Sequence, residues 1–374
     1  MKRLAKPNPV IMGAVAIALI LGVTGPALAD YVINADKSVT FTTPAATNTA
    51  RMTITYSAVT DTTKPMIRQG NVFTFTTEPL APNWYRYCFF VDGVTDQDGL
   101  RMEDPSNPNE YFGPFAKQWS YFMLSGEETD FLETKNVPHG NVSKVWFYSS
   151  VMSSWRTMWV YTPPEYNKDN RKYPVLYLHH GSGNTGEEWI GNMRTNFILD
   201  NLIAEGKAVP MIAVMPTHND IPENADPALS VYPIKEVINS IEPILEKQFR
   251  VLSGSKNRAV AGLSKGGGRT LQTMIQVPTF ADYFLPLSQA WNASQIAYLE
   301  NDHQDLLLAL GANRNIKRLW ISIGKDDAIN QRMPGMLALF DKYHVEYEFV
   351  QYEGAHFPDV WRHQLHDFAQ FLFK

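Results

Sequence analysis

Gly262-Leu263-Ser264-Lys265-Gly266 is the stretch that decides the fold, because a strand pattern precedes it and a helix pattern follows it. The apolar residues 259–261 predict the strand, and residues 266–276 predict the helix. This G-x-S-x-G pattern is typical of a sharp strand-to-helix turn, whose glycines leave room for neighbouring backbone. The turn also directs the backbone N–H of Lys265 toward the place where an oxyanion would form. We therefore expect a nucleophilic serine at Ser264.

Around this turn, apolar strands alternate with helical segments from about residue 130 to the C-terminus. Nearly continuous apolar strands of this kind are typical of a parallel sheet that helices cover on both faces. The pattern therefore predicts an α/β fold. The predicted strands are 175–178, 211–215, 259–261, 283–287, 319–323 and 347–351, and the predicted helices are 196–205, 234–249, 266–276 and 360–373.

Residues 38–125 carry a different pattern, in which short apolar and polar residues alternate between turn signals. Residues 52–56, 72–75 and 84–91 predict strands, and no helical period interrupts them. This favours an antiparallel β-sandwich. Because the chain of 374 residues exceeds the usual size of one core, we expect an all-β domain over 30–128 and an α/β domain over 129–374.

The first 29 residues have the pattern of a secretory signal peptide. A basic start with Lys2, Arg3 and Lys6 precedes an uncharged apolar run over 11–23, and Ala27-Leu28-Ala29 follows as a cleavage signal. The apolar run is shorter than the roughly 20 residues that span a bilayer. We therefore expect cleavage after Ala29, a secreted or periplasmic protein, and no membrane association afterwards.

Composition argues against several other classes of protein. The chain has 33 Lys and Arg against 38 Asp and Glu, a net charge of −5, so no nucleic-acid partner is expected. Cys88 is the only cysteine, which excludes an intrachain disulfide and a thiolate metal site. His179-His180 is not accompanied by an H-E-x-x-H pattern. We therefore expect no metal and no cofactor, and the oligomeric state stays open.

A serine nucleophile needs a histidine base and an acid that orients it. Gly324-Lys325-Asp326-Asp327 follows the predicted strand 319–323, and Glu353-Gly354-Ala355-His356 follows 347–351. The carboxyl ends of parallel strands meet at one edge of a sheet, so these residues should converge with Ser264. The chain order serine, acid, histidine is that of the α/β-hydrolase fold. At this point both Asp326 and Asp327 are candidates for the acid.

A second oxyanion donor is expected from the loop that follows strand 175–178. His179-His180-Gly181 begins this loop, and the backbone N–H of Ser182 or Gly183 would complement that of Lys265. The oxyanion hole predicted from the sequence therefore comprises Lys265, Ser182 and Gly183.

Taken together, these segments resemble the esterase D-like enzymes of carbohydrate esterase family one, which includes feruloyl esterases and acetyl xylan esterases. The resemblance covers about residues 130–374, and the upstream part is similar to the immunoglobulin-like, glycogen-binding-module-like domain that precedes many such catalytic domains. It implies Ser264 as nucleophile, His356 as general base and Asp327, which closes a Gly-x-x-Asp pattern, as the acid. Lys265 departs from the methionine or glutamine usual in the family. The segments that carry the resemblance are 173–181, 198–207, 261–264, 356–362 and 85–93.

The resemblance implies a substrate class of plant cell-wall polysaccharide or oligosaccharide esters. We expect hydroxycinnamoyl (feruloyl) esters on xylan, with Trp291 lining an apolar slot for the acyl group and Lys265 near it. Trp291 could equally be a buried anchor for its loop. The alternatives are an acetyl xylan esterase, a general carboxylesterase or an acyltransferase of the same fold, and more remotely an inactive glycan-binding protein.

Overall fold

The computed structural model describes residues 30–45, 52–57, 62–91, 102–104, 106–107, 110–112, 118–218, 229–230 and 232–374. The predicted signal peptide, residues 1–29, lies outside this part of the chain. Among the helices that are described, none has the length and apolar character needed to cross a membrane.

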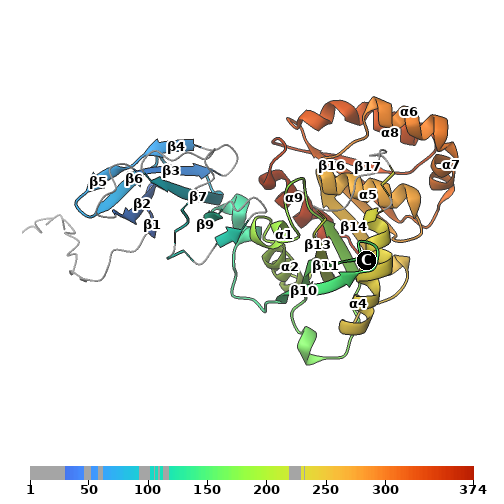
Figure 1. The fold of residues 1–374 in the computed structure, drawn as a ribbon, viewed down its shortest axis with the longest axis horizontal. Helices are drawn as coiled ribbons and strands as arrows, with labels where there is room; N and C mark the ends of the chain where they lie inside the picture. The colour runs from blue at the N-terminus through green and yellow to red at the C-terminus, as the bar shows by residue number, and fades with distance from the viewer. Residues whose placement is uncertain are drawn as a thin grey trace, which may run out of the picture.

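The N-terminal region consists of two antiparallel sheets, which form the blue and teal lobe of Figure 1. This confirms the all-β prediction. The first sheet has the order β1 (Asp30–Ile33), β2 (Val39–Pro44), β6 (Val72–Thr76) and β5 (Ile67–Gln69). The second has the order β4 (Thr62–Pro65), β3 (Met52–Ser57), β7 (Asn83–Val91), β9 (Gln118–Leu124) and β8 (Glu110–Phe112).

Strand β7 supplies side chains to both faces of its sheet, as the period of two along a strand requires. Tyr85, Tyr87 and Phe89 enter the core between the sheets, whereas Trp84 and Phe90 lie in a second apolar cluster on the other face. All five side chains are buried. The aromatic row on the outer face is therefore covered rather than open to solvent.

The C-terminal region is built on one eight-stranded sheet, which is mixed rather than wholly parallel. Neighbouring strands from β12 to β17 pair in parallel, and the hairpin of β10 and β11 adds two antiparallel strands at one edge. This confirms the α/β prediction. The strand order is β10 (Asn141–Ser149), β11 (Ser154–Thr162), β13 (Ile212–Pro216), β12 (Val175–His179), β14 (Arg258–Leu263), β15 (Tyr283–Leu287), β16 (Arg318–Gly324) and β17 (Glu348–Tyr352).

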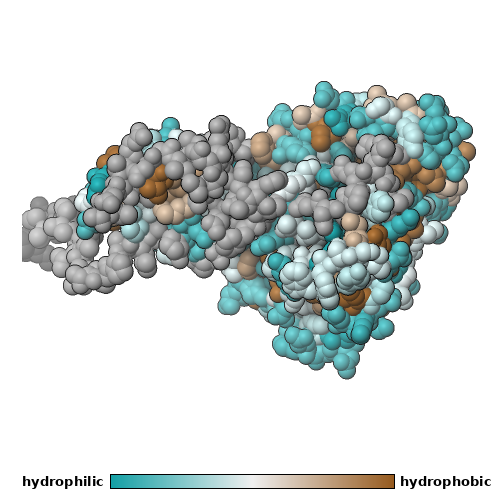
Figure 2. Space-filling model, viewed as in Figure 1, coloured by the Kyte–Doolittle hydropathy of each residue, from teal (hydrophilic) through white to brown (hydrophobic). Residues whose placement is uncertain are grey.

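Helices cover both faces of this sheet, and each face has its own hydrophobic cluster (Figure 1). One cluster includes side chains from α1 (Glu188–Gly191), α2 (Thr195–Ala204) and α9 (Pro358–Ala369). The other includes side chains from α3 (Tyr232–Glu236), α4 (Glu242–Gln248), α5 (Lys265–Gln276), α6 (Ala293–Asp302), α7 (Gln304–Ala312) and α8 (Met333–Lys342). The outer surface is mainly hydrophilic on the side that Figure 2 shows, with hydrophobic residues in small groups.

The predicted helix over 234–249 is interrupted by one turn of π-helix, Val237–Ile241, between α3 and α4. Pro243 has no N–H to donate to the carbonyl four residues earlier, and its ring crowds that carbonyl. A wider turn accommodates the lost bond. The amphipathic pattern is thus continuous although the helix is not.

The two regions contact each other through buried cations of the C-terminal region. The Arg194 guanidinium lies 4.2 Å from the centre of the Trp84 ring, and Arg362 donates to Asn83 Oδ1 at 3.4 Å. Trp84 thus packs against the C-terminal region. The predicted boundary between residues 128 and 129 falls within the 3₁₀ helix Glu127–Leu132 and stays a prediction.

Candidate active site

Ser264 occupies the turn between β14 and α5 with φ 54° and ψ −119°, a conformation that is strained for a residue with a side chain. The flanking glycines make this turn possible. A Cβ at Gly262 would collide with the Gly266 carbonyl, and one at Gly266 would collide with the His179 carbonyl. The side chain of Ser264 therefore projects from a tightly packed crossing of strand and helix.

His356 stands between Ser264 and Asp327 and touches both. Its Nε2 lies 2.9 Å from Ser264 Oγ, and its Nδ1 lies 2.7 Å from Asp327 Oδ2. The three residues follow the carboxyl ends of β14, β16 and β17, so the sheet brings them to one edge. Asp326 is exposed, whereas Asp327 is buried. This arrangement suits transfer of a proton from the serine hydroxyl to the imidazole.

Asp327 is 3% exposed, and hydrogen bonds hold its charge in place. Burial by itself raises the pKa of Asp327, but bonds from His356 and from the backbone N–H of Ile329 outweigh burial and lower it below its ordinary value. Ser288 adds a further hydrogen bond to the carboxylate and receives one from Trp361 Nε1 at 2.9 Å. Neither Ser288 nor Trp361 was assigned a role from the sequence, since their contacts appear only in the fold.

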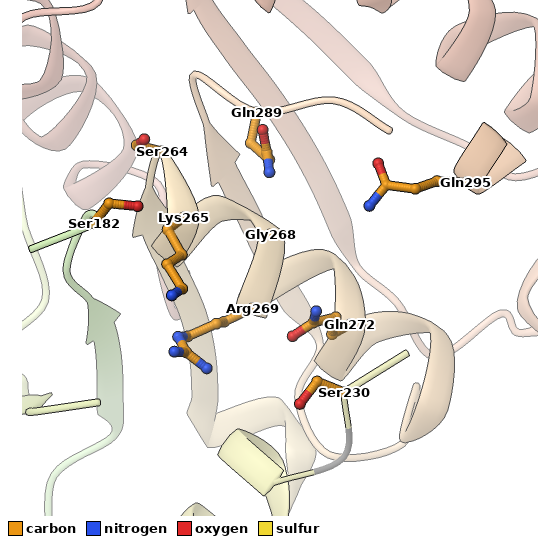
Figure 3. A pocket seen from close by; sticks show the side chains of 9 residues that line it. All are labelled: Ser182, Ser230, Ser264, Lys265, Gly268, Arg269, Gln272, Gln289 and Gln295. Carbon is orange, nitrogen blue, oxygen red and sulfur yellow. The ribbon is translucent and has the colours of Figure 1, made fainter. Parts of the chain in front are cut away.

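The predicted oxyanion loop lies beside Ser264. Gly181, at the start of this loop, is held by hydrogen bonds at both its backbone N–H and its carbonyl. The backbone N–H of Gly181 donates to Glu188 Oε2 at 3.1 Å, and its carbonyl accepts from His180 Nδ1 at 2.7 Å. Ser182 lies next to Ser264 and Lys265 in Figure 3, and Gly183 has a positive φ of 71°. Sequence reasoning missed Glu188, because one acid at the start of a helix looks like an ordinary N-terminal charge.

Three buried histidines lie behind this loop. His179 Nδ1 and His218 Nε2 are 2.8 Å apart, and the backbone N–H of His218 donates to His180 Nε2 at 2.9 Å. Burial lowers the pKa of His179 to about 3 and that of His180 to about 4, so both are neutral near pH 7. Within the described part of the chain, no group of three or more His, Cys, Asp or Glu side chains could hold a metal ion.

A cavity of about 350 Å³ opens beside Ser264 along one side of α5 (Figure 3). Its described lining is polar, and it includes the cationic side chains of Lys265 and Arg269. No aromatic residue is among these lining residues. They are Ser182, Ser230, Ser264, Lys265, Gly268, Arg269, Gln272, Gln289 and Gln295.

Trp291, which we expected to line an acyl slot, does not line this cavity. Its side chain is 3% exposed and packs in the hydrophobic core with Phe340, whose ring centre is 5.7 Å away. The chain turns inward after Gln289, so Gln289 faces the cavity while Trp291 anchors the loop before α6. The prediction for Trp291 was therefore wrong, because a strand end alone does not tell which loop side chain points outward.

The fold and the serine–histidine–aspartate geometry define an α/β-hydrolase. The family model "Putative esterase" matches residues 149–372. The chain therefore belongs to this esterase family.

The chain is also similar to curated and solved proteins. It is 30% identical over 320 residues to the endo-1,4-beta-xylanase/feruloyl esterase of Xylanibacter ruminicola, a match that covers 82% of this chain and 40% of that protein. The chain thus spans less than half the length of this relative. A ferulic acid esterase from Anaeromyces mucronatus has a TM-score of 0.54 at 22% identity, over 64% of this chain and 93% of that one. The enterobactin esterase of Shigella flexneri has a TM-score of 0.62 at 18% identity, over 92% and 96%. At these identities the solved structures show a shared fold.

Proposed function

We propose that this protein is a serine esterase that hydrolyses feruloyl-type esters on xylan-like plant cell-wall polysaccharides. The observation that carries the proposal is the position of His356, within hydrogen-bond distance of both Ser264 and Asp327. The similarity to the endo-1,4-beta-xylanase/feruloyl esterase of Xylanibacter ruminicola supports the substrate class.

The proposed reaction has two halves that use the same three side chains. Ser264 Oγ attacks the ester carbonyl carbon while His356 Nε2 takes the serine proton. The bond to the sugar oxygen then breaks, and His356 gives the proton to the leaving alcohol. Water attacks the acyl-serine with His356 again as base, which releases the carboxylic acid and restores Ser264. Asp327 keeps the imidazole in the tautomer that can accept at Nε2.

Charge on the carbonyl oxygen has to be stabilised at each tetrahedral stage. The backbone N–H of Lys265, at the start of α5, and an N–H from Ser182 or Gly183 are the proposed donors. Both segments lie against Ser264 in Figure 3. No step requires a cofactor.

An acetyl ester is the second candidate substrate. The described lining of the cavity is polar and lacks an aromatic wall, which a hydroxycinnamoyl ring would favour. A small acyl group would need no such wall.

We further propose export with cleavage after Ala29, for which sequencing of the exported protein should find Asp30 as the first residue.

Substitution Ser264→Ala tests the reaction, and a substrate panel tests the ester. The variant removes one hydroxyl, so it should fold as the wild type does and lose activity by a factor on the order of 10⁶. Methyl ferulate, acetylated xylan and 4-nitrophenyl acetate should be assayed with both proteins, and thermal unfolding serves as the folding control. Retained turnover by a folded Ser264→Ala protein would overturn the proposal. Preference for acetylated xylan over methyl ferulate would replace the feruloyl assignment with the acetyl one.

A further inference from the structure

Three aromatic side chains project into solvent from the edge hairpin of the C-terminal sheet. Trp146 is 63% exposed, Tyr148 is 53% exposed and Trp155 is 68% exposed. Tyr148 pairs directly with Trp155 across the hairpin, and Trp146 is two residues along the same face. We call these three residues the hairpin platform. Tryptophan is on average highly buried, so two tryptophans exposed to this degree need an explanation.

The backbone beneath the hairpin platform is rigidly held. On the opposite face of the hairpin, Phe147 and Met158 are buried in the core. Arg156, which follows Trp155, lies 2.6 Å from Glu236 and donates to the Thr217 carbonyl at 2.6 Å. The backbone that carries the exposed rings is thus already ordered, so binding of a ligand to the rings costs little backbone entropy.

The hairpin platform lies at the end of the sheet where the parallel strands terminate, and Ser264 lies at the same end. Because β11 runs antiparallel to β13, the start of β11 and the end of β10 lie beside the carboxyl ends of the parallel strands. The order β11, β13, β12, β14 separates the platform from the strand before Ser264 by three strand spacings, or about 15 Å.

A groove lies between the two tryptophans of the hairpin platform and the residue that follows β13. It has a volume of about 210 Å³ and is lined by Trp146, Trp155, Arg156, Thr157 and Thr217. Thr217 Oγ1 accepts from the backbone N–H of Gly186, which lies on the segment that continues from Ser182. One lining residue of the groove is thus bonded to the segment that continues from the loop beside Ser264.

We infer that the hairpin platform binds the polysaccharide chain whose ester is hydrolysed at Ser264. Sugar rings present faces of C–H bonds that pack on the negative face of an aromatic ring, while their hydroxyls need polar partners. Trp146 and Trp155 supply the rings, and Thr157 and Thr217 supply hydroxyl groups in the same groove. The platform and Ser264 lie at the same end of the sheet, which favours the polysaccharide chain of the ester substrate as the occupant rather than a second copy of this protein. This inference rests on the proposed function and assigns the sugar side of the substrate.

Binding is tested first without chemistry, in the full-length Ser264→Ala protein. Insoluble and soluble arabinoxylan should retain this protein, and adding Trp155→Ala should weaken retention about tenfold, as expected for loss of one aromatic stacking contact. Leu308→Ala on α7 is the matched control, because Leu308 is also a large exposed hydrophobic residue, at 58%. Equal retention of all three proteins would overturn the inference.

Kinetics then separate the platform from the catalytic residues. In an active background, Trp155→Ala and Trp146→Ala should raise KM for feruloylated arabinoxylan about tenfold and leave kcat/KM for methyl ferulate unchanged. If acetate is the acyl group, acetylated xylan and 4-nitrophenyl acetate form the corresponding pair. Equal effects on the polymer and the small ester would overturn the platform while leaving the esterase proposal intact. A change in sedimentation without a change in polymer KM would assign the surface to self-association and also overturn it.

Discussion

Glu188 accepts a hydrogen bond from the backbone N–H of Gly181 at 3.1 Å, which ties helix α1 to the loop beside Ser264. Its other carboxylate oxygen accepts from Asn184 Nδ2 at 2.6 Å. Gly181 is so close to Ser264 that a Cβ at this position would lie 3.7 Å from Ser264 Cβ. Because Glu188 holds both ends of the segment 181–184, its carboxylate positions the proposed oxyanion donors between them.

Removal of the carboxylate should therefore slow the reaction. In Glu188→Leu the backbone N–H of Gly181 and the side-chain amide of Asn184 lose their acceptor. We expect kcat to fall about 10- to 100-fold with little change in KM. Glu188→Gln should retain most activity, because its amide can still accept from Gly181 and can donate to Asn184 once that side chain flips. Glu187→Leu is the matched control on the neighbouring acid. Equal losses in all three variants would show a general effect of the helix rather than positioning of the loop.

Burial raises the pKa of Glu188 to about 7 from its ordinary value of 4.5. Between these pH values the folded protein holds a proton that the unfolded chain has lost. The raised pKa of Glu188 therefore adds fully to the free energy of unfolding below about pH 4.5, and this added stability is lost as pH rises through about 7. The difference corresponds to roughly 3 kcal/mol, at 1.36 kcal/mol per pH unit.

Urea unfolding at pH 5 and pH 8 measures this effect. From pH 5 to pH 8, the free energy of unfolding should fall by more in the wild type than in Glu188→Gln, which cannot ionise there. All other titrating groups are shared, so they cancel in the comparison. Parallel pH dependences of the two proteins would contradict the assignment.

The two neighbouring aspartates should differ sharply when each is changed to asparagine. Asp327→Asn replaces the carboxylate that contacts His356 Nδ1, so the imidazole loses its favoured tautomer and kcat should fall by a factor on the order of 10⁴. Asp326→Asn changes an exposed side chain and should leave kcat nearly unaltered. Steady-state kinetics on a soluble aryl ester would compare them, and similar losses would leave the orienting acid unassigned.

Arg362 should contribute to stability because it is buried where the two regions meet. It is 1% exposed and donates to both the carbonyl and Oδ1 of Asn192, at 2.9 and 2.8 Å. Arg362→Met keeps much of the volume but removes these donors, so the free energy of unfolding should drop by about 1–3 kcal/mol. Arg332→Met, at an exposed position, is the control. Thermal unfolding would detect the drop, and equal midpoints for the two variants would refute it.

Local pattern was sufficient to predict six strands of the C-terminal sheet, but the edge hairpin of β10 and β11 and the helices α1, α6, α7 and α8 were not predicted. Each predicted α/β strand is present within two residues of its predicted bounds, because a buried strand needs a continuous apolar run and turns need their own residues. The glycines around Ser264 were informative for the same reason, since only glycine fits between such closely packed backbones.

The direction of individual loop side chains was decided by the tertiary structure. Sequence order alone left Asp326 and Asp327 equivalent, and only the path of the loop turns Asp327 toward His356. Trp291 and Gln289 follow the same strand, yet the tryptophan is drawn into the core and the glutamine faces the cavity.

Residues distant in the chain supply the remaining contacts of the site. Glu188 reaches Gly181 only because α1 packs behind the loop, and the hairpin platform is exposed on the face of the hairpin opposite the buried Phe147 and Met158. Strand and helix periods depend on near neighbours, so the sequence by itself determined the parallel strands of the C-terminal sheet and the turn at Ser264. Contacts between loops depend on how those elements pack, and therefore only the tertiary structure could decide them.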